Sequence, residues 1–213
     1  PDFLHAFHRA VALCTQALRQ WDEAVWDKAP TSMVRLETPA AVIAKIAYTL
    51  ANPVDAGLVE HAHEWPGAKV LVDEIGQGML GARRPEVYLD PKNPDWPAEA
   101  TLPISLPPGI EPAKAAVFRG QVATEVERLE ASARAKMEEQ RRAFLDAERA
   151  QAVPPTTRAT TPEPAIDRNP RFAVGRDQGD AWRRAVATLR AFQSSYRSAL
   201  EQWRAGIRDV VFP

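Results

Sequence analysis

A stripe of apolar residues between residues 112 and 151 restricts the fold of this chain more than any other feature. Its members recur at intervals of three or four residues, as on one face of an α-helix; they are Phe118, Val122, Val126, Leu129, Ala133 and Met137. Oppositely charged residues lie one turn apart on the polar side, as Glu130 and Arg134 do, which favours a helix further. The pattern predicts one long amphipathic helix over 112–151 whose apolar face belongs to a core.

A second stripe of the same kind predicts a final helix over residues 180–208. Its members are mostly large and include aromatic side chains: Trp182, Val186, Leu189, Tyr196, Leu200, Trp203 and Ile207. The proline- and threonine-rich segment 153–170 is typical of a flexible linker. Two long amphipathic helices joined in this way are expected to pack as an antiparallel pair.

The first part of the chain predicts shorter elements. Apolar spacing indicates a helix over residues 3–26 and a short strand at 33–36. Thr38 followed by Pro39 is a strong start signal for a second helix. We expect that helix to stop at Asn52-Pro53, because a residue before proline is disfavoured in the α conformation.

The predicted fold class is mainly α with a small β component. The segment 69–110 is rich in proline and glycine, and it predicts a loop-rich linker with a short hairpin formed from extended pieces at 86–89 and 101–106. The expected organisation is a first domain over residues 1–68, this linker, and a helical extension over 111–208.

Composition restricts the function classes. The 213 residues are 45% apolar and 26% charged with a formal net charge of −1, so DNA binding would require a local basic face. A single cysteine excludes an intrachain disulfide, and no apolar run approaches the roughly 20 residues that span a bilayer. We therefore expect a cytoplasmic protein without a membrane partner. Because the chain begins at Pro1 without Met and ends in an apolar segment, we also expect a fragment.

Two short motifs carry a specific resemblance. The run YTLANPVDAGLV at 48–59, followed by EWPG at 64–67, resembles the signature that closes the transposase domain of REP-associated tyrosine transposases, which are HUH-type single-strand DNA transposases. The run WDEAVW at 21–26 resembles the aromatic turn of that family after its nucleophile helix. The resemblance covers residues 3–68, and its signature residues have a structural role: Trp21, Trp26, Tyr48, Asn52, Pro53, Gly57, Trp65 and Pro66.

The resemblance implies the back part of an HUH-type domain and a two-part chemistry. In the family, a histidine pair holds a divalent metal that polarises the scissile phosphate, and a tyrosine attacks to form a phosphotyrosine. The histidine pair would precede Pro1, and no tyrosine occupies the nucleophile position near residues 11–14. The resemblance therefore implies no catalytic residue, metal ligand or cofactor in this chain. A divalent metal is expected only in a full-length active relative.

Three features offer alternatives. His61 and His63 are separated by one hydrophobic residue, like the histidine pair of the family, and Glu64 follows them, but they come after the signature and lie in a loop. They are either metal ligands or ordinary surface or partly buried histidines. His5 and His8 lie three residues apart on the first helix, with the same two interpretations. Cys14 is either a substitute nucleophile or, on the apolar face of its helix, a buried inert thiol.

DNA contact would use basic side chains near the first two helices and the following loop. The candidates are Arg9, Arg19, Lys28, Arg35, Lys45, Arg83 and Arg84. The alternative is that they are scattered solubilising charges. Two functional hypotheses follow: a transposase-related fragment that binds hairpin or single-stranded DNA, or a non-catalytic helical module for oligomerisation, for example as a homodimer. In either case we expect mutation of Asn52 or Gly57 to lower stability.

Overall fold

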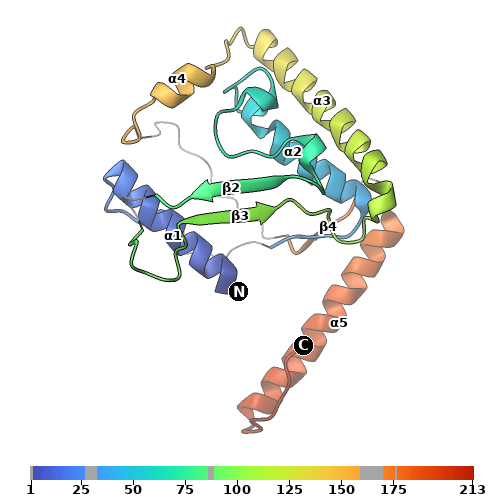
Figure 1. Cartoon of the computed structure of the whole chain (residues 1–213). Helices are drawn as coiled ribbons and strands as arrows, with labels where there is room; N and C mark the ends of the chain where they lie inside the picture. Colours follow the sequence, from blue (N-terminus) through green and yellow to red (C-terminus); the bar gives the residue numbers. More distant parts are fainter. Residues whose placement is uncertain (1, 27–32, 86–88, 159–169, 176) are drawn as a thin grey trace. The chain divides into compact units, whose positions relative to one another are not determined.

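The computed structural model describes residues 2–26, 33–85, 89–158, 170–175 and 177–213, and it is mainly helical with two small sheets (Figure 1). The predicted fold class is therefore confirmed. The α-helices are α1 (Asp2–Arg19), α2 (Pro39–Asp55), α3 (Ala115–Glu139), α4 (Ala147–Ala152) and α5 (Gly179–Arg204). The strands are β1 (Arg35–Leu36), β2 (Met79–Arg83), β3 (Glu99–Pro103) and β4 (Phe172–Ala173). Short 3-10 helices lie at η1 (Ala62–Glu64), η2 (Val72–Glu74) and η3 (Pro112–Lys114).

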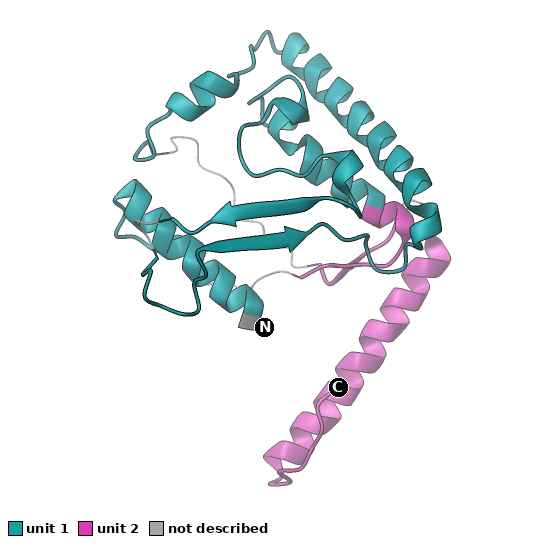
Figure 2. Ribbon diagram, viewed as in Figure 1, with its two compact units in different colours: residues 1–30, 43–165 teal, residues 31–42, 166–213 magenta. Residues whose placement is uncertain are grey.

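The chain divides into two compact units (Figure 2). The first combines residues 1–30 with 43–165, and the second combines residues 31–42 with 166–213. This division differs from the boundaries expected at residues 68 and 111, because the signature region, the segment 69–110 and α3 belong to one unit. The two long helices of the expected pair, α3 and α5, belong to different units.

The core of the first unit forms where α3 meets the end of α2 and the loop after it. Val54, Val59 and Ala133 are buried together, and Trp65 and Phe144 pack against them. The apolar stripe of α3 faces inward as predicted, since Phe118, Val122, Ala133 and Met137 are all buried. Burial of this stripe supplies the apolar contact that an isolated helix of this composition would lack.

The end of α2 differs from the sequence prediction. The helix does not stop at Asn52-Pro53 but continues to Asp55, with Pro53 inside its last turn. Gly57 ends it, at a φ of +73°. The N–H of Gly57 donates to the carbonyl of Val54 and the N–H of Leu58 to that of Pro53, both at 2.9 Å. This pattern of a left-handed glycine with two closing hydrogen bonds satisfies the last carbonyls, so one hydrogen bond lost at the proline is tolerated.

The long helix predicted over 112–151 is broken. After η3, α3 ends at Glu139, and α4 begins only at Ala147. Arg141 has a φ of +52°, and the Arg142 N–H donates to the Met137 carbonyl at 2.9 Å, so the same capping pattern closes α3 without a glycine. The chain then returns to α2, where the Leu145 N–H donates to the Gly57 carbonyl at 2.9 Å. The segment between the two helices still contains the apolar residues Ala143, Phe144 and Leu145, so its composition did not mark a break.

Arg141 is therefore a position where glycine should stabilise the protein. A left-handed conformation costs a non-glycine residue about 1 kcal/mol, and glycine adopts it freely. We expect Arg141→Gly to raise the free energy of unfolding by up to about 1 kcal/mol, measured by urea denaturation. Arg142→Gly is the matched control, and it should lower stability slightly because Arg142 needs no positive φ. An equal loss of stability in both variants would contradict the left-handed conformation of Arg141 as a source of strain.

The remaining parts of the first unit also turn earlier than periodicity indicated. The helix predicted over 3–26 ends at Arg19, and Gln20 adopts a φ of +51°. Trp26 then folds back so that its Nε1 donates to the His8 carbonyl at 2.8 Å.

In the segment 69–110, β2 and β3 form an antiparallel hairpin with Met79 opposite Pro103. Of the extended piece expected at 86–89, residues 86–88 lie outside the described residues.

In the second unit, β1 and β4 pair in parallel, with Arg35 opposite Phe172. The start of α2 is capped as predicted, because Thr38 Oγ1 accepts the Ala41 N–H at 3.2 Å. The same oxygen accepts the Gly175 N–H at 3.1 Å, which ties the cap to the segment after β4. Along α5, the small residues Ala185 and Ala199 are buried.

Candidate nucleic-acid interface

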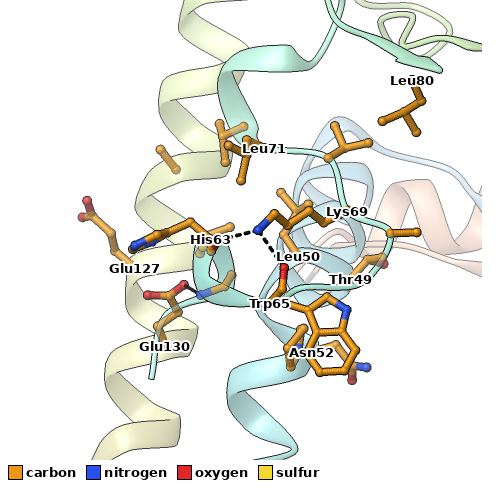
Figure 3. Close-up of a pocket in the computed structure, with 17 residues that line it drawn as sticks. Thr49, Leu50, Asn52, His63, Trp65, Lys69, Leu71, Leu80, Glu127 and Glu130 are labelled. Carbon is orange, nitrogen blue, oxygen red and sulfur yellow. Dashed lines mark hydrogen bonds between the residues drawn. The ribbon is translucent and has the colours of Figure 1, made fainter. Parts of the chain in front are cut away.

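A hollow of the first unit lies beside the end of α2. It is a cavity of about 600 Å³ between α2, the loop that contains η1, and α3 (Figure 3). Most of its lining is apolar, and its polar lining residues are Thr49, Asn52, His63, Lys69, Glu127 and Glu130. Three signature residues, Asn52, Pro53 and Trp65, also line it.

The loop wall of the cavity is held by its own side chains. Glu64 accepts the N–H of His61 at 3.0 Å, which closes the turn of η1. The Lys69 ammonium donates to the carbonyl of Trp65 at 2.7 Å, and it also donates to the carbonyl of His63. These contacts fix the part of the loop that carries Trp65.

Glu130 joins α3 to this loop. Its side chain is almost buried, and Oε1 accepts the Ala62 N–H at 2.9 Å. Oε2 accepts from Arg134 Nη1 at 3.2 Å and lies 3.3 Å from His61 Nδ1. Burial raises the pKa of this carboxyl group, but the hydrogen bonds from Ala62, Arg134 and His61 outweigh burial and hold the pKa below its ordinary value. The group is therefore an anion that stabilises the loop.

His61 has two alternative partners in this network. Its Nδ1 lies 3.3 Å from the Glu130 carboxylate and also 3.3 Å from Arg134 Nη1. The guanidinium can only donate and the carboxylate can only accept, so one ring nitrogen satisfies one of them at a time. Protonation of Nδ1 therefore selects Glu130, and a lone pair there selects Arg134.

A second cavity of about 310 Å³ adjoins the first. The two share Thr49, Leu50 and Val70 as lining residues, so they follow one another along α2. Lys45 lines the smaller cavity, and its Nζ lies 5.1 Å from the centre of the Tyr48 ring. Tyr48 is 51% exposed. The exposed side of α2 therefore presents a lysine and an aromatic ring beside two apolar hollows.

The other signature residues lie away from the cavities or serve the backbone. Gly57 ends α2, and Pro66 is exposed. Trp21 lies against two guanidinium groups. Its ring centre is 4.9 Å from Cζ of Arg19 and 5.9 Å from Cζ of Arg158. Among the described residues, Trp21 Nε1 is the buried side-chain polar atom that lacks a hydrogen-bond partner.

Several of the predicted basic residues have partners of their own among the described residues. Arg83 pairs with Glu99 at 3.2 Å, and Arg84 donates to the Trp96 carbonyl. Arg35 pairs with Glu37 at 2.6 Å in the second unit.

The other predicted basic residues include one, Lys45, that lies at the cavities. Arg9 is exposed on α1, Arg19 donates to the Thr157 carbonyl, and Lys28 lies outside the described residues. Of the predicted basic residues that the structure describes, only Lys45 lines either of these two cavities. Sequence reasoning missed Lys69, and its position just after the EWPG motif is the signal that could have found it.

The histidine pairs do not form a metal centre. The rings of His61 and His63 stack with their centres 5.5 Å apart, and the His8 ring lies 5.0 Å from that of Trp26. Within the described ranges, no three histidine, cysteine, aspartate or glutamate side chains are grouped so as to hold a metal ion. Cys14 is half-buried.

Comparison of the chain with known proteins identified no similar protein. No family model, no curated protein and no solved structure matches this chain. Among the described residues, no helix has both the length and the apolar character needed to cross a membrane.

Proposed function

We propose that this chain is a non-catalytic, DNA-binding part of a cytoplasmic relative of the REP-associated tyrosine transposases, and that it binds hairpin or single-stranded DNA. The observation that carries the proposal is the meeting of signature residues at the cavities along α2. Asn52, Pro53 and Trp65 come from the two halves of the motif and line one hollow. DNA transposition itself would require a histidine pair and a tyrosine nucleophile from elsewhere.

The surface beside α2 has the groups that single-stranded DNA requires. Unpaired bases bind aromatic and apolar side chains, and phosphates bind lysine or arginine. Trp65 and the shared Leu50 supply the first kind of contact. Lys45, which lines the smaller cavity, supplies the phosphate contact, and Tyr48 is exposed next to it.

The proposal is tested by titrating fluorescent hairpin and single-stranded DNA with the full chain over a salt series. We expect binding that weakens as salt rises, because each phosphate contact releases counterions. Lys45→Ala should weaken binding to every sequence and reduce the salt slope by about 0.7 for a single strand. Lys136→Ala, an exposed lysine on α3 outside both cavities, is the matched control. Absence of binding at low salt would refute the proposal.

The helical interaction module is the second candidate, and α5 favours it. Trp182, Phe192, Tyr196 and Trp203 are each 43–52% exposed along this helix. Large exposed aromatic residues are enriched at protein interfaces. A stable homodimer in sedimentation experiments, together with no affinity for DNA, would support this candidate in place of the first.

A further inference from the structure

We propose that the two adjoining cavities hold successive unpaired nucleobases of a DNA strand, and that the larger cavity selects a base that has an amino group where thymine has O4 and guanine has O6, namely cytosine or adenine. This inference rests on the proposed DNA-binding function, and it adds the location and the specificity of the contact.

The shape of the cavities fits successive bases. Their volumes are about 600 Å³ and 310 Å³, which lie in the range of pockets that enclose small organic groups. Thr49, Leu50 and Val70 line both, so they form the ridge between the two hollows. A strand that follows α2 would cross this ridge and place one base on each side of it.

The walls of the larger cavity suit the faces of a base. Trp65 is half-buried, and Figure 3 shows its indole beside Asn52 at one side of the cavity. Stacking on an aromatic ring tolerates any base, because every base has a π-face. The wall residues Trp65 and Leu50 therefore explain affinity, whereas selection between bases requires a polar group.

Glu127 is the polar group that can select. It lines the cavity from α3, with its carboxylate at the outer edge of that helix in Figure 3, and its side chain makes no hydrogen bond or ion pair within the described part of the chain. An ionised carboxylate only accepts hydrogen bonds, and it accepts from the amino group of cytosine. Thymine presents a carbonyl oxygen at the equivalent position, which the carboxylate repels. Glu130 is less suited to this role, because it is almost buried and its oxygens already accept from Ala62 and Arg134.

The positive and negative side chains at the cavities lie on different elements of the fold, as binding of a DNA strand by its phosphates and by a base edge requires. Lys45 belongs to α2 and lines the smaller cavity, whereas Glu127 belongs to α3. Lys69 uses two of its three donors on the carbonyls of His63 and Trp65, which leaves one for a ligand. The phosphates would therefore lie along α2, and the edge of the base would point toward α3.

The test compares short labelled oligodeoxycytidine and oligodeoxythymidine by fluorescence anisotropy, with the full chain at neutral pH. We expect the cytidine strand to bind about fivefold more tightly or better, the lower end of what one good base contact gives. Glu127→Gln should reduce this ratio to near one, because an amide can donate to thymine as well as accept from cytosine. Glu139→Gln makes the same charge change in the last turn of α3, outside both cavities, and should keep the ratio.

The outcomes separate this inference from the function on which it rests. Salt-dependent binding of both strands with equal affinity would overturn base selection and leave DNA binding intact. A preference for cytidine that survives Glu127→Gln would overturn the role of Glu127. No binding of either strand would overturn both proposals. Circular dichroism of the Glu127→Gln variant checks that it folds, as an exposed helical glutamine should.

Discussion

Replacing Glu130 by alanine is expected to lower the free energy of unfolding by about 3 kcal/mol. Glu130 is 8% exposed, and its loss leaves the Ala62 N–H without its acceptor and the Arg134 guanidinium without its carboxylate partner, although Arg134 still donates to the Glu60 carbonyl. A buried donor that loses its acceptor keeps the full cost of its lost hydration. Denaturation by urea, followed by circular dichroism, measures the change.

The control for this prediction is Glu139→Ala on the same helix. Glu139 is exposed, so its replacement should change the free energy of unfolding by less than about 0.5 kcal/mol. A similar loss in both variants would mean that the Glu130 contacts contribute nothing beyond helix propensity.

The contribution of Glu130 should also depend on pH. Its pKa in the folded protein is lowered by its hydrogen-bond donors, which outweigh burial. A depressed folded-state pKa gives stability that is fully present above the unfolded value of about 4.3 and is lost as pH falls through the folded pKa. The difference between the wild type and Glu130→Ala should therefore shrink in acid. A difference that grows in acid would contradict the sign.

Replacing Gly57 by valine is expected to cost about 3 kcal/mol of stability, from two sources. The φ of +73° is strained for any side chain and most for a β-branched one. A Cβ at this position would also lie 3.1 Å from Met137 Cε in the core. Thermal denaturation of the variant measures the sum.

Two further variants separate these sources. Gly57→Ala carries the backbone strain and the Met137 contact, whereas Gly109→Ala carries a similar strain at φ +85° with nothing near its Cβ. We expect the Gly57 variant to lose more. Equal losses would show that Met137 yields without cost. The Asn52 side chain is exposed, so Asn52→Ala should change the free energy of unfolding little. Of the two residues whose mutation the sequence predicted to lower stability, we therefore expect the large effect at Gly57.

Two local patterns were reliable, the apolar stripe of α3 and the cap of α2, whereas the stop signal at Asn52-Pro53 was not. The α3 stripe from Phe118 to Met137 faces the core, and Thr38 caps α2, because periodicity and capping depend on residues within one or two turns. The turns at Gln20 and Arg141 escaped prediction. Each uses a positive φ at a residue other than glycine, and no local preference indicates that.

The candidate site shows the same limit. The signature marked Asn52 and Trp65 as belonging together in sequence, but it did not show that α3 would supply Glu127 and Glu130 to the same cavity. Most of the predicted basic residues have partners elsewhere, such as Arg83 with Glu99. A charge has no periodicity that reveals its partner, so sequence could name the candidates without grouping them.

The sequence by itself determined the mainly helical class, the buried face of α3 and the start of α2. These depend on side-chain spacing and on backbone preferences that each residue carries with it. Only the tertiary structure decided that α3 ends at Glu139, that Leu145 returns to Gly57, and that α2 and α3 enclose two adjoining cavities. Those outcomes depend on contacts between residues more than 60 positions apart, such as Ala62 with Glu130, whose free energy exists only once the chain has folded.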